Sequence, residues 1–147
     1  MKTIGEMVKG RELYSVGPNA TVLDAARLMS EKGIGAVLVV DEGKLQGIFS
    51  ERDLVTRVIA PNLNPAEVEV RDVMTRNLIV AGPEDTYQDC LNKMKKARIR
   101  HLPIVAENRV IGMLSVRDLI SYELESKDFE IQQLNHFIHY VPPKVTA

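Results

Sequence analysis

The sequence has few of the features that build disulfide frameworks, secretion signals or basic nucleic-acid surfaces. Its single cysteine, Cys90, excludes an intrachain disulfide and a multi-cysteine metal site. Lysine and arginine total 19 against 20 acidic residues, so the net charge is −1 and no basic footprint for nucleic acid exists. No apolar run approaches the roughly 18 residues of a membrane helix, and the N-terminus lacks a signal-peptide core. We therefore expect a cytoplasmic protein that binds neither nucleic acid nor membrane.

Aromatic residues are also scarce, at 5%, and tryptophan is absent. The core must therefore consist mainly of valine, isoleucine, leucine, alanine and methionine. The apolar fraction of 45% and the charged fraction of 27% are ordinary for a globular protein. A chain of 147 residues is long enough for one domain of usual size, or for two small units that share a core.

The chain contains two copies of one unit. A shift of 65 residues aligns 16–55 with 81–120 without a gap, and thirteen of the forty pairs are identical. Average residue usage would give roughly two or three identities by chance. An internal duplication is therefore the main feature of the sequence.

Each copy predicts the element order β-α-β-β-α. A short strand near Val16 or Val80 precedes a helix that a Thr-x-x-Asp capping box opens at Thr21 or Thr86. Two strands joined by a polar turn follow, and the first, "AVLVV" (36–40), is suited to burial on both faces. The last helix of each copy begins after a serine. Residue 33, a glycine, is the expected C-cap of the first helix.

One such unit cannot bury both faces of its sheet, so we expect the two copies to pack around a pseudo-twofold axis. The predicted fold is α+β. We divide the chain into a first repeat (5–60), a linker (61–71), a second repeat (72–124) and a C-terminal helix and tail (125–147). The tail sequence places Ile131, Leu134 and Ile138 on one helical face, which should dock on the module or on a second subunit.

The motif Gly-h-h-Ser-x-Arg-Asp, where h is apolar, occurs at 47–53 and again at 112–118. It predicts a strand that ends where a helix begins, with N–H groups and a helix dipole that suit a phosphate. The arginine adds a forked cation, the aspartate can accept both hydroxyls of a ribose, and the glycine would let a ligand approach the backbone. The same residues also fit a plain capping box with a solvated arginine.

These motifs, with "DVMT" (72–75) and "RIRHLPIV" (98–105), closely resemble the CBS domain family over about residues 5–122. The resemblance implies a pair of CBS domains, or Bateman module, with two clefts that bind adenine nucleotides such as AMP, ATP or NAD. It also implies that the motif aspartate holds ribose, that the serine meets phosphate, and that apolar residues of the opposite copy hold adenine. Such pairs associate further into dimers, so a homodimer is expected.

Carried over residue by residue, the resemblance assigns two clefts. The first would contain Ser50, Arg52 and Asp53 with Thr75, Ile79, Val80, Ile99, Arg100 and His101. The second would contain Ser115, Arg117 and Asp118 with Val16, Ile34, Gly35 and Ala36. Because Gly35 and Ala36 replace the basic pair Arg100 and His101, and Thr75 has no match in "MVKGRE" (7–12), we expect the Asp53 cleft to bind more tightly.

The function that follows is regulatory: a nucleotide bound between the copies changes their arrangement, and an unidentified effector protein in trans reads the change. A ligand-independent dimerisation scaffold is the alternative, although intact serine, arginine and aspartate in both motifs argue against it. We expect no enzyme activity, because His101 has no evident nucleophile or orienting partner in the sequence. We also expect no metal, since His136 and His139 lack a third ligand at a matching spacing.

Overall fold

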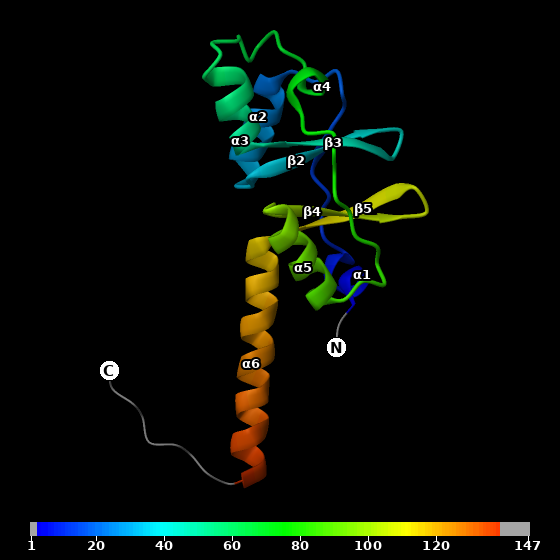
Figure 1. Ribbon diagram of the computed structural model, residues 1–147, viewed down its shortest axis with the longest axis vertical. Helices are drawn as coiled ribbons and strands as arrows, with labels where there is room; N and C mark the ends of the chain where they lie inside the picture. Colours follow the sequence, from blue (N-terminus) through cyan, green and yellow to red (C-terminus); the bar gives the residue numbers. More distant parts are fainter. Residues whose placement is uncertain (1–2, 139–147) are drawn as a thin grey trace, which may run out of the picture.

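The computed structural model describes residues 3–138, apart from the side chains of 129 and 135–138. The first part of the chain contains α1 (Ile4–Val8), β1 (Ser15–Val16), α2 (Val22–Lys32), β2 (Ala36–Asp41), β3 (Lys44–Ser50), α3 (Glu51–Asp53) and η1 (Leu54–Ile59). The second contains α4 (Val70–Val73), α5 (Tyr87–Ala97), β4 (His101–Ala106), β5 (Arg109–Ser115) and α6 (Val116–Ile138). The strands form a sheet of order β1-β2-β3 and a separate β4-β5 hairpin. The predicted α+β fold with two repeats is confirmed (Figure 1).

The two hairpins have the same register, residue for residue. Ala36 lies opposite Ser50 and His101 lies opposite Ser115, and each hairpin carries a β-bulge at the equivalent place, 39/40 and 104/105. Both repeats therefore bring the start of one strand beside the serine that ends the next. This register places the two candidate motifs at equivalent corners.

The second repeat lacks the short first strand that the duplication predicts. In the first repeat, the N–H of Leu38 donates to the carbonyl of Tyr14 at 3.2 Å. The equivalent of Leu38 is Pro103, which has no N–H to donate. The contact of this segment with β4 is consequently reduced to a single bridge between Ala81 and Ile104.

The helix predicted after Ser50 is not a regular α-helix throughout. It begins as the single turn α3 and continues as the π-helical turn η1, in which the N–H of Ala60 donates to the carbonyl of Val55 at 2.9 Å. Val58 is fully buried on the inner side of this turn. The helix therefore still covers the first sheet, as the apolar pattern requires.

Each repeat's core is completed by the short helix that precedes the other repeat. Figure 1 shows α1, the first helix of the chain, lying with α5 and the second hairpin. The first core contains Val22, Ala25, Met29, Val37, Val39, Phe49 and Val58 together with Val70, Val73 and Met74 from the α4 segment. The second contains Ala81, Cys90, Met94, Leu102, Ile104, Leu114 and Leu119 together with Ile4 and Val8 from α1. Each core thus contains a segment that lies outside its own repeat in the sequence. The boundaries 5–60, 61–71, 72–124 and 125–147 stay a prediction.

This exchange explains the glycine of each motif. A Cβ at Gly47 would lie 2.8 Å from the carbonyl oxygen of Thr75, and a Cβ at Gly112 would lie 2.7 Å from Cβ of Val8. These contacts are too close for any side chain. The expectation that the glycine admits a ligand is therefore wrong here, since the exchanged segment of the chain itself occupies that space.

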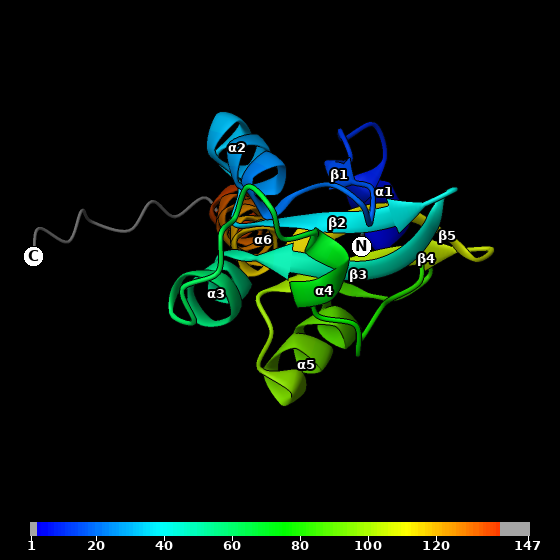
Figure 2. The same cartoon turned by 90° about the horizontal axis from the view of Figure 1, so that it is seen from above.

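The two sheets face each other through a third, smaller core. Its buried residues are Ala36, Leu38 and Ile48 from the first repeat and Val110 from the second. Figure 2 shows the two hairpins one above the other. Since Val37 and Val39 point into the first core and Ala36 and Leu38 into this interface, the run "AVLVV" is buried on both faces, as predicted.

Helix α6 starts within the second repeat and extends well beyond it (Figure 1). Its first turns are anchored by Tyr122, whose ring centroid lies 5.2 Å from that of Tyr87, and by Glu123, which accepts a 2.9 Å hydrogen bond from the Tyr87 hydroxyl. The predicted tail beyond residue 138, including His139, lies outside the described residues. Between residues 3 and 138, no helix is long and apolar enough to cross a membrane.

Candidate functional site

A cleft of about 810 Å³ lies between the two repeats. Strand β2, the segment before it and the segment before β1 give it a largely apolar wall, and the strand-to-helix corner at Ser115 gives it polar groups. The apolar lining includes Val8, Leu13, Tyr14, Met29, Ile34, Ala36, Leu38, Leu54, Met113 and Val116. The charged and polar lining includes Arg11, Glu12, Ser30, Glu51, Arg100, His101, Ser115, Arg117 and Asp118. A mainly apolar cavity with a few convergent polar groups is typical of a small-molecule site.

Asp118 is the central carboxylate of this cleft. Its Oδ2 accepts a 2.8 Å hydrogen bond from the N–H of Ser115, and its own N–H donates to Ser115 Oγ at 3.1 Å, which closes the first turn of α6. Its Oδ1 forms an ion pair with Arg11 at 3.1 Å. The side chain is 25% exposed, so a ligand in the cleft can reach it.

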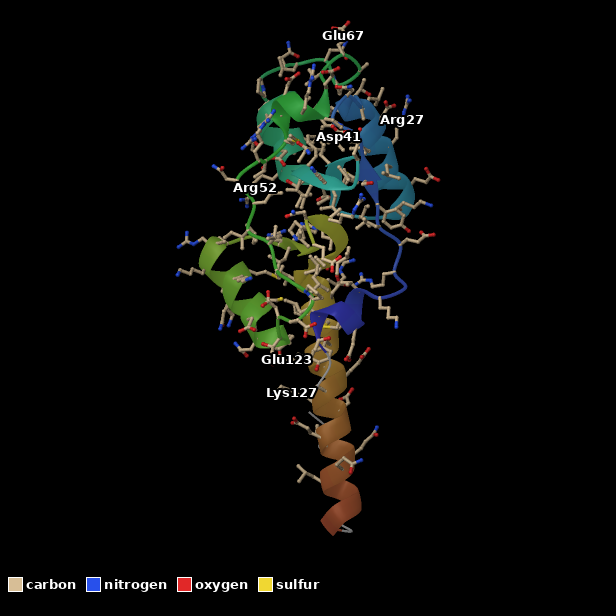
Figure 3. The ribbon with its side chains drawn as sticks, turned by 90° about the vertical axis from the view of Figure 1, so that its right-hand side faces the viewer. Arg27, Asp41, Arg52, Glu67, Glu123 and Lys127 are labelled. Atoms are coloured by element: carbon tan, nitrogen blue, oxygen red, sulfur yellow. The ribbon has the colours of Figure 1, made fainter. Side chains whose placement is uncertain are left out.

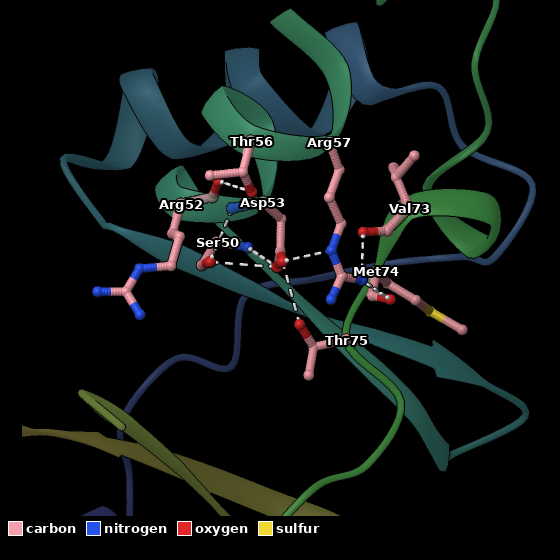
Figure 4. Close-up of polar contacts among 8 residues, drawn as sticks. All are labelled: Ser50, Arg52, Asp53, Thr56, Arg57, Val73, Met74 and Thr75. Carbon is pink, nitrogen blue, oxygen red and sulfur yellow. Dashed lines mark hydrogen bonds and ion pairs between the residues drawn. The ribbon is translucent and has the colours of Figure 1, made fainter. Parts of the chain in front are cut away.

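Asp53, the equivalent residue, is held much more tightly (Figure 4). Its Oδ2 accepts from the N–H of Ser50 at 3.0 Å and from Ser50 Oγ at 3.1 Å. Its Oδ1 accepts from Thr75 Oγ1 at 3.0 Å and lies 3.6 Å from Nε of Arg57. The side chain is only 7% exposed. Both oxygens of this carboxylate therefore already accept hydrogen bonds from the protein, three in all, and Arg57 adds an ion pair.

The difference between the two corners comes from two positions of the duplicated unit. Thr75 corresponds to Gly10, so the hydroxyl that satisfies Asp53 has no counterpart at Asp118. Arg57 also has no counterpart, because Tyr122 occupies the equivalent place. The guanidinium of Arg57 additionally donates to the carbonyls of Val73 and Met74, which ties the Asp53 corner to the α4 segment. Asp53 is thus a buried structural node, and Asp118 is the accessible one.

Arg100 and His101 line the Asp118 cleft, and this grouping differs from the predicted one. The hairpin register is the reason: His101 pairs with Ser115, and the carbonyl of Arg100 accepts from the N–H of Val116 at 2.9 Å. The structure therefore brings them together with Ser115, Arg117, Asp118, Ile34, Gly35 and Ala36. The expectation of tighter binding in the Asp53 cleft loses its basis, because Arg100 and His101 lie with Asp118 and not with Asp53.

Burial is the main cause of a lowered pKa at His101, and the neighbouring Arg100 lowers the pKa further. Glu51 and Asp118 oppose this shift. A Cβ at Gly35 would lie 3.6 Å from both His101 and Glu51, so both side chains lie beside Gly35, where the repeats face each other. The imidazole is therefore neutral near pH 7 unless an anion arrives beside it.

The other predicted residues are dispersed. Val16 packs against the first core and Ile99 against the second. Ile79 and Val80 are exposed, and Val80 lines a separate shallow depression with Lys44, Leu45, Gln46, Arg76, Leu78, Val105 and Asn108. Ser50 and Thr75 contact Asp53, while the Arg52 side chain points away from that carboxylate (Figure 4).

Sequence reasoning missed Arg11, Glu12, Tyr14 and Glu51. Arg11 was detectable, because the 65-residue shift aligns it with Arg76, just after Thr75. Glu51 was detectable as the residue between the motif serine and arginine. Glu12 and Tyr14 carry no motif, and only the fold brings them to the cleft. Among the residues that the structure describes, no group of three or more histidine, cysteine, aspartate or glutamate side chains is placed to hold a metal.

Comparisons with known proteins agree with this architecture. The CBS domain model matches the chain twice, at residues 4–60 and 70–125. The chain belongs to the CBS domain family. It is 31% identical over 127 residues to the CBS domain-containing protein YhcV of Bacillus subtilis, which covers 85% of this chain and 90% of that protein.

Solved structures of CBS pairs share the fold. A CBS-domain protein from Burkholderia ambifaria superimposes with a TM-score of 0.79 and 34% identity, over 84% of this chain and 95% of that one. The CBS domain pair of protein MJ0100 gives a TM-score of 0.75 and 26% identity, over 86% of this chain and 98% of that one. That pair was crystallised with 5′-methylthioadenosine and S-adenosyl-L-methionine.

The two motif aspartates of this CBS pair should differ in their contribution to stability. Asp53→Ala should cost about 3 kcal/mol, because it removes a buried carboxylate and leaves the part-buried hydroxyls of Ser50 and Thr75 without their charged acceptor. Asp118→Ala should cost about 1 kcal/mol, the usual loss for a helix cap near the surface. Urea denaturation of both variants measures the difference, and equal losses would contradict the distinction between a structural and an accessible carboxylate.

Proposed function

We propose that this CBS pair is a regulatory module that binds an adenosine ligand in the Asp118 cleft. The observation that carries the proposal is the convergence, in one cavity, of an accessible carboxylate, a helix start with basic neighbours, and an apolar wall. These are the three chemistries that ribose, phosphate and adenine require. The ligands of the MJ0100 pair, both adenosine compounds, support the same class of ligand.

Each group of the ligand has a proposed partner. Asp118 accepts hydrogen bonds from the ribose hydroxyls, and the start of α6 at Ser115, with Arg100 and His101, receives the phosphate. Ile34 and Ala36 from the opposite repeat hold the adenine ring. Arg117 is proposed as an outer phosphate contact. The other residues assigned from the sequence lie outside the lining of this cleft: Ser50, Arg52, Asp53, Thr75, Ile79, Val80, Ile99 and Val16.

The charge balance of the cleft favours a monophosphate as the ligand. The lining contains three arginines, at 11, 100 and 117, and three acids, Glu12, Glu51 and Asp118. A cavity with this balance has no excess of positive charge to compensate a triphosphate. We therefore propose that AMP binds more tightly than ATP, and that NAD is a weaker ligand.

Signalling follows from the position of the cleft. Its walls belong to both repeats, so a bound ligand favours one arrangement of the repeats over others. The equilibrium between arrangements shifts only if the ligand binds one of them more tightly than the others. We propose that an effector protein in trans reads this arrangement inside the cell, and that the role is regulatory and not catalytic. Ser115 pairs with His101 across the hairpin, and its hydroxyl caps α6 by accepting the N–H of Asp118.

Isothermal titration calorimetry with AMP tests the proposal. Wild type should bind, and Asp118→Asn should weaken binding about ten- to a hundredfold, because charge-assisted hydrogen bonds to ribose are lost. Asp89→Asn is the matched control, since Asp89 closes an equivalent capping box at the start of α5, outside the cleft lining. No binding by wild type, or equal affinities for wild type and Asp118→Asn, would contradict the proposal.

Binding of AMP should depend on pH through His101. A phosphate beside the imidazole favours the imidazolium, so binding raises a pKa that is depressed in the free protein, and a proton is taken up. Affinity should therefore increase about three- to tenfold as the pH falls from 8 to 6.5. Calorimetry in buffers of different ionisation enthalpy measures the proton uptake directly.

His101→Gln is the control for that experiment. The phosphate of AMP itself titrates near pH 6, and the variant retains this contribution while it lacks the imidazole. The pH dependence of the variant should be flat or reversed over the same range. Identical profiles for the two proteins would exclude His101 as a phosphate contact.

Helix α6 supports a second proposal, a homodimer. Its exposed apolar residues Ile120, Leu124, Ile131 and Leu134 follow a heptad pattern, with Lys127 at one of the inner positions. Figure 3 shows Glu123 near the body and Lys127 further out along the projecting part of the helix. A projecting helix of this length is marginal alone in water, so its apolar stripe needs a partner.

The charges of the stripe indicate how a second copy would pack. A parallel pair would set Lys127 against Lys127 of the second copy at an inner position, which is a repulsive contact, whereas an antiparallel pair sets it against an apolar residue. We therefore propose an antiparallel pair of α6 helices between two copies of this chain. The same helix favours the alternative function, a ligand-independent scaffold, and the AMP titration distinguishes the two.

Analytical ultracentrifugation tests the dimer. Wild type should sediment as a dimer, and the double variant Leu124→Glu, Leu134→Glu should sediment as a monomer with less helix by circular dichroism. Glu125→Gln, on the other face of α6, should remain dimeric. The protein concentration should be about 100 µM, so that a weak homodimer is populated. A monomeric wild type, or a dimeric double variant, would show that this face is not the interface.

A further inference from the structure

Arg11 contacts the carboxylate oxygen of Asp118 that does not accept the hydrogen bond from Ser115. Its Nη2 lies 3.1 Å from Asp118 Oδ1, and both residues line the same cleft. The two side chains are 47% and 25% exposed, so the pair is partly solvated. Such pairs contribute little to stability and are easily exchanged for another partner. Arg11 is therefore a displaceable occupant of the cleft.

The internal repeat shows that this contact is particular to one corner. The equivalent of Arg11 is Arg76, whose guanidinium donates to the carbonyl of Arg71 at 2.7 Å and does not contact Asp53. At that corner, Thr75 supplies the hydrogen bond to the carboxylate. Because Gly10 replaces Thr75 in the first repeat, Asp118 Oδ1 is left open and Arg11, the next residue, reaches it.

The side chains that follow Arg11 in the chain have contacts of their own. Glu12, the adjacent acid, accepts a hydrogen bond from the Tyr14 hydroxyl, and Lys32 lies over the Tyr14 ring at 5.6 Å. Glu12 is thereby engaged within its own segment. Arg100 and Arg117 are the other arginines of the cleft, and neither forms an ion pair with an acid among residues 3–138.

We propose that Arg11 makes the cleft selective for phosphorylated over unphosphorylated adenosine, an inference that rests on the proposed function. Without ligand, Arg11 neutralises Asp118. A nucleoside must break this ion pair to place its ribose on Asp118, and it offers the released guanidinium no new partner. A nucleotide offers its phosphate, which binds the guanidinium in a forked arrangement. Arg11 thus exchanges the Asp118 carboxylate for the phosphate, and this new contact makes its displacement from Asp118 favourable.

The position of Arg11 also connects ligand selection to the arrangement of the repeats. Arg11 lies between α1, which packs in the second core, and β1, which belongs to the first sheet. Movement of its side chain from Asp118 to a phosphate takes place on the segment that crosses from one repeat to the other. A phosphorylated ligand is the one that gives Arg11, on this segment, an anionic partner inside the cleft.

Calorimetric titration of wild type, Arg11→Gln and Arg76→Gln with adenosine and with AMP tests the inference. In Arg11→Gln, adenosine should bind about two- to fivefold more tightly, because a competing ion pair is gone, and AMP about tenfold more weakly, because a charged phosphate contact is lost. The preference for AMP over adenosine should thus fall by more than tenfold. Arg76→Gln should keep the wild-type preference, and all three proteins should have the same thermal midpoint within a few degrees.

Two results would overturn the inference, and they have different meanings. If wild type binds AMP and Arg11→Gln shows the same ratio of AMP to adenosine affinity, Arg11 has no role in selectivity, although the cleft remains a nucleotide site. If neither protein binds AMP or adenosine, the proposed function itself fails and the inference fails with it.

Discussion

The apolar contact between the two hairpins is the constraint on which the cleft depends. Ala36, Leu38 and Ile48 of the first repeat pack on Val110 of the second, and this small core holds the two sheets face to face. The identical registers of the hairpins then bring both strand-to-helix corners to the junction between the repeats. The exchanged helices α1 and α4 reinforce the contact, since neither repeat completes its core without the segment before the other.

Duplication produced two corners of the same design, and single substitutions gave them different roles. A threonine and an arginine contact Asp53, which is buried, and we expect this carboxylate to stabilise the fold. A glycine and a tyrosine stand at the equivalent positions around Asp118, which is left with one exchangeable partner, Arg11. We therefore propose one adenosine site in each chain, at the corner where the carboxylate has fewer partners within the protein.

Much of the fold was predictable from the sequence, because its signals are local. The capping boxes at Thr86 and Ser50, the buried strand "AVLVV" and the repeat itself are short-range patterns, and the structure contains each of them. The exchange of α1 and α4 was not predictable, because nothing local indicates which repeat a short helix packs on. For the same reason, the glycines of the motifs were assigned to ligand approach, although Val8 and Thr75 lie against them. The grouping of Arg100 and His101 with Asp118 depends on hairpin register and sheet packing, which the motifs do not encode, and Arg11 belongs to no motif.

A crystal structure of the protein with AMP tests the central claim most directly. We expect one nucleotide per chain, with both ribose hydroxyls on Asp118, the phosphate at the start of α6, and Arg11 released from Asp118 onto the phosphate. Asp53 should keep its contacts with Ser50, Thr75 and Arg57. A nucleotide whose ribose lies on Asp53, or one bound outside the junction of the repeats, would contradict it.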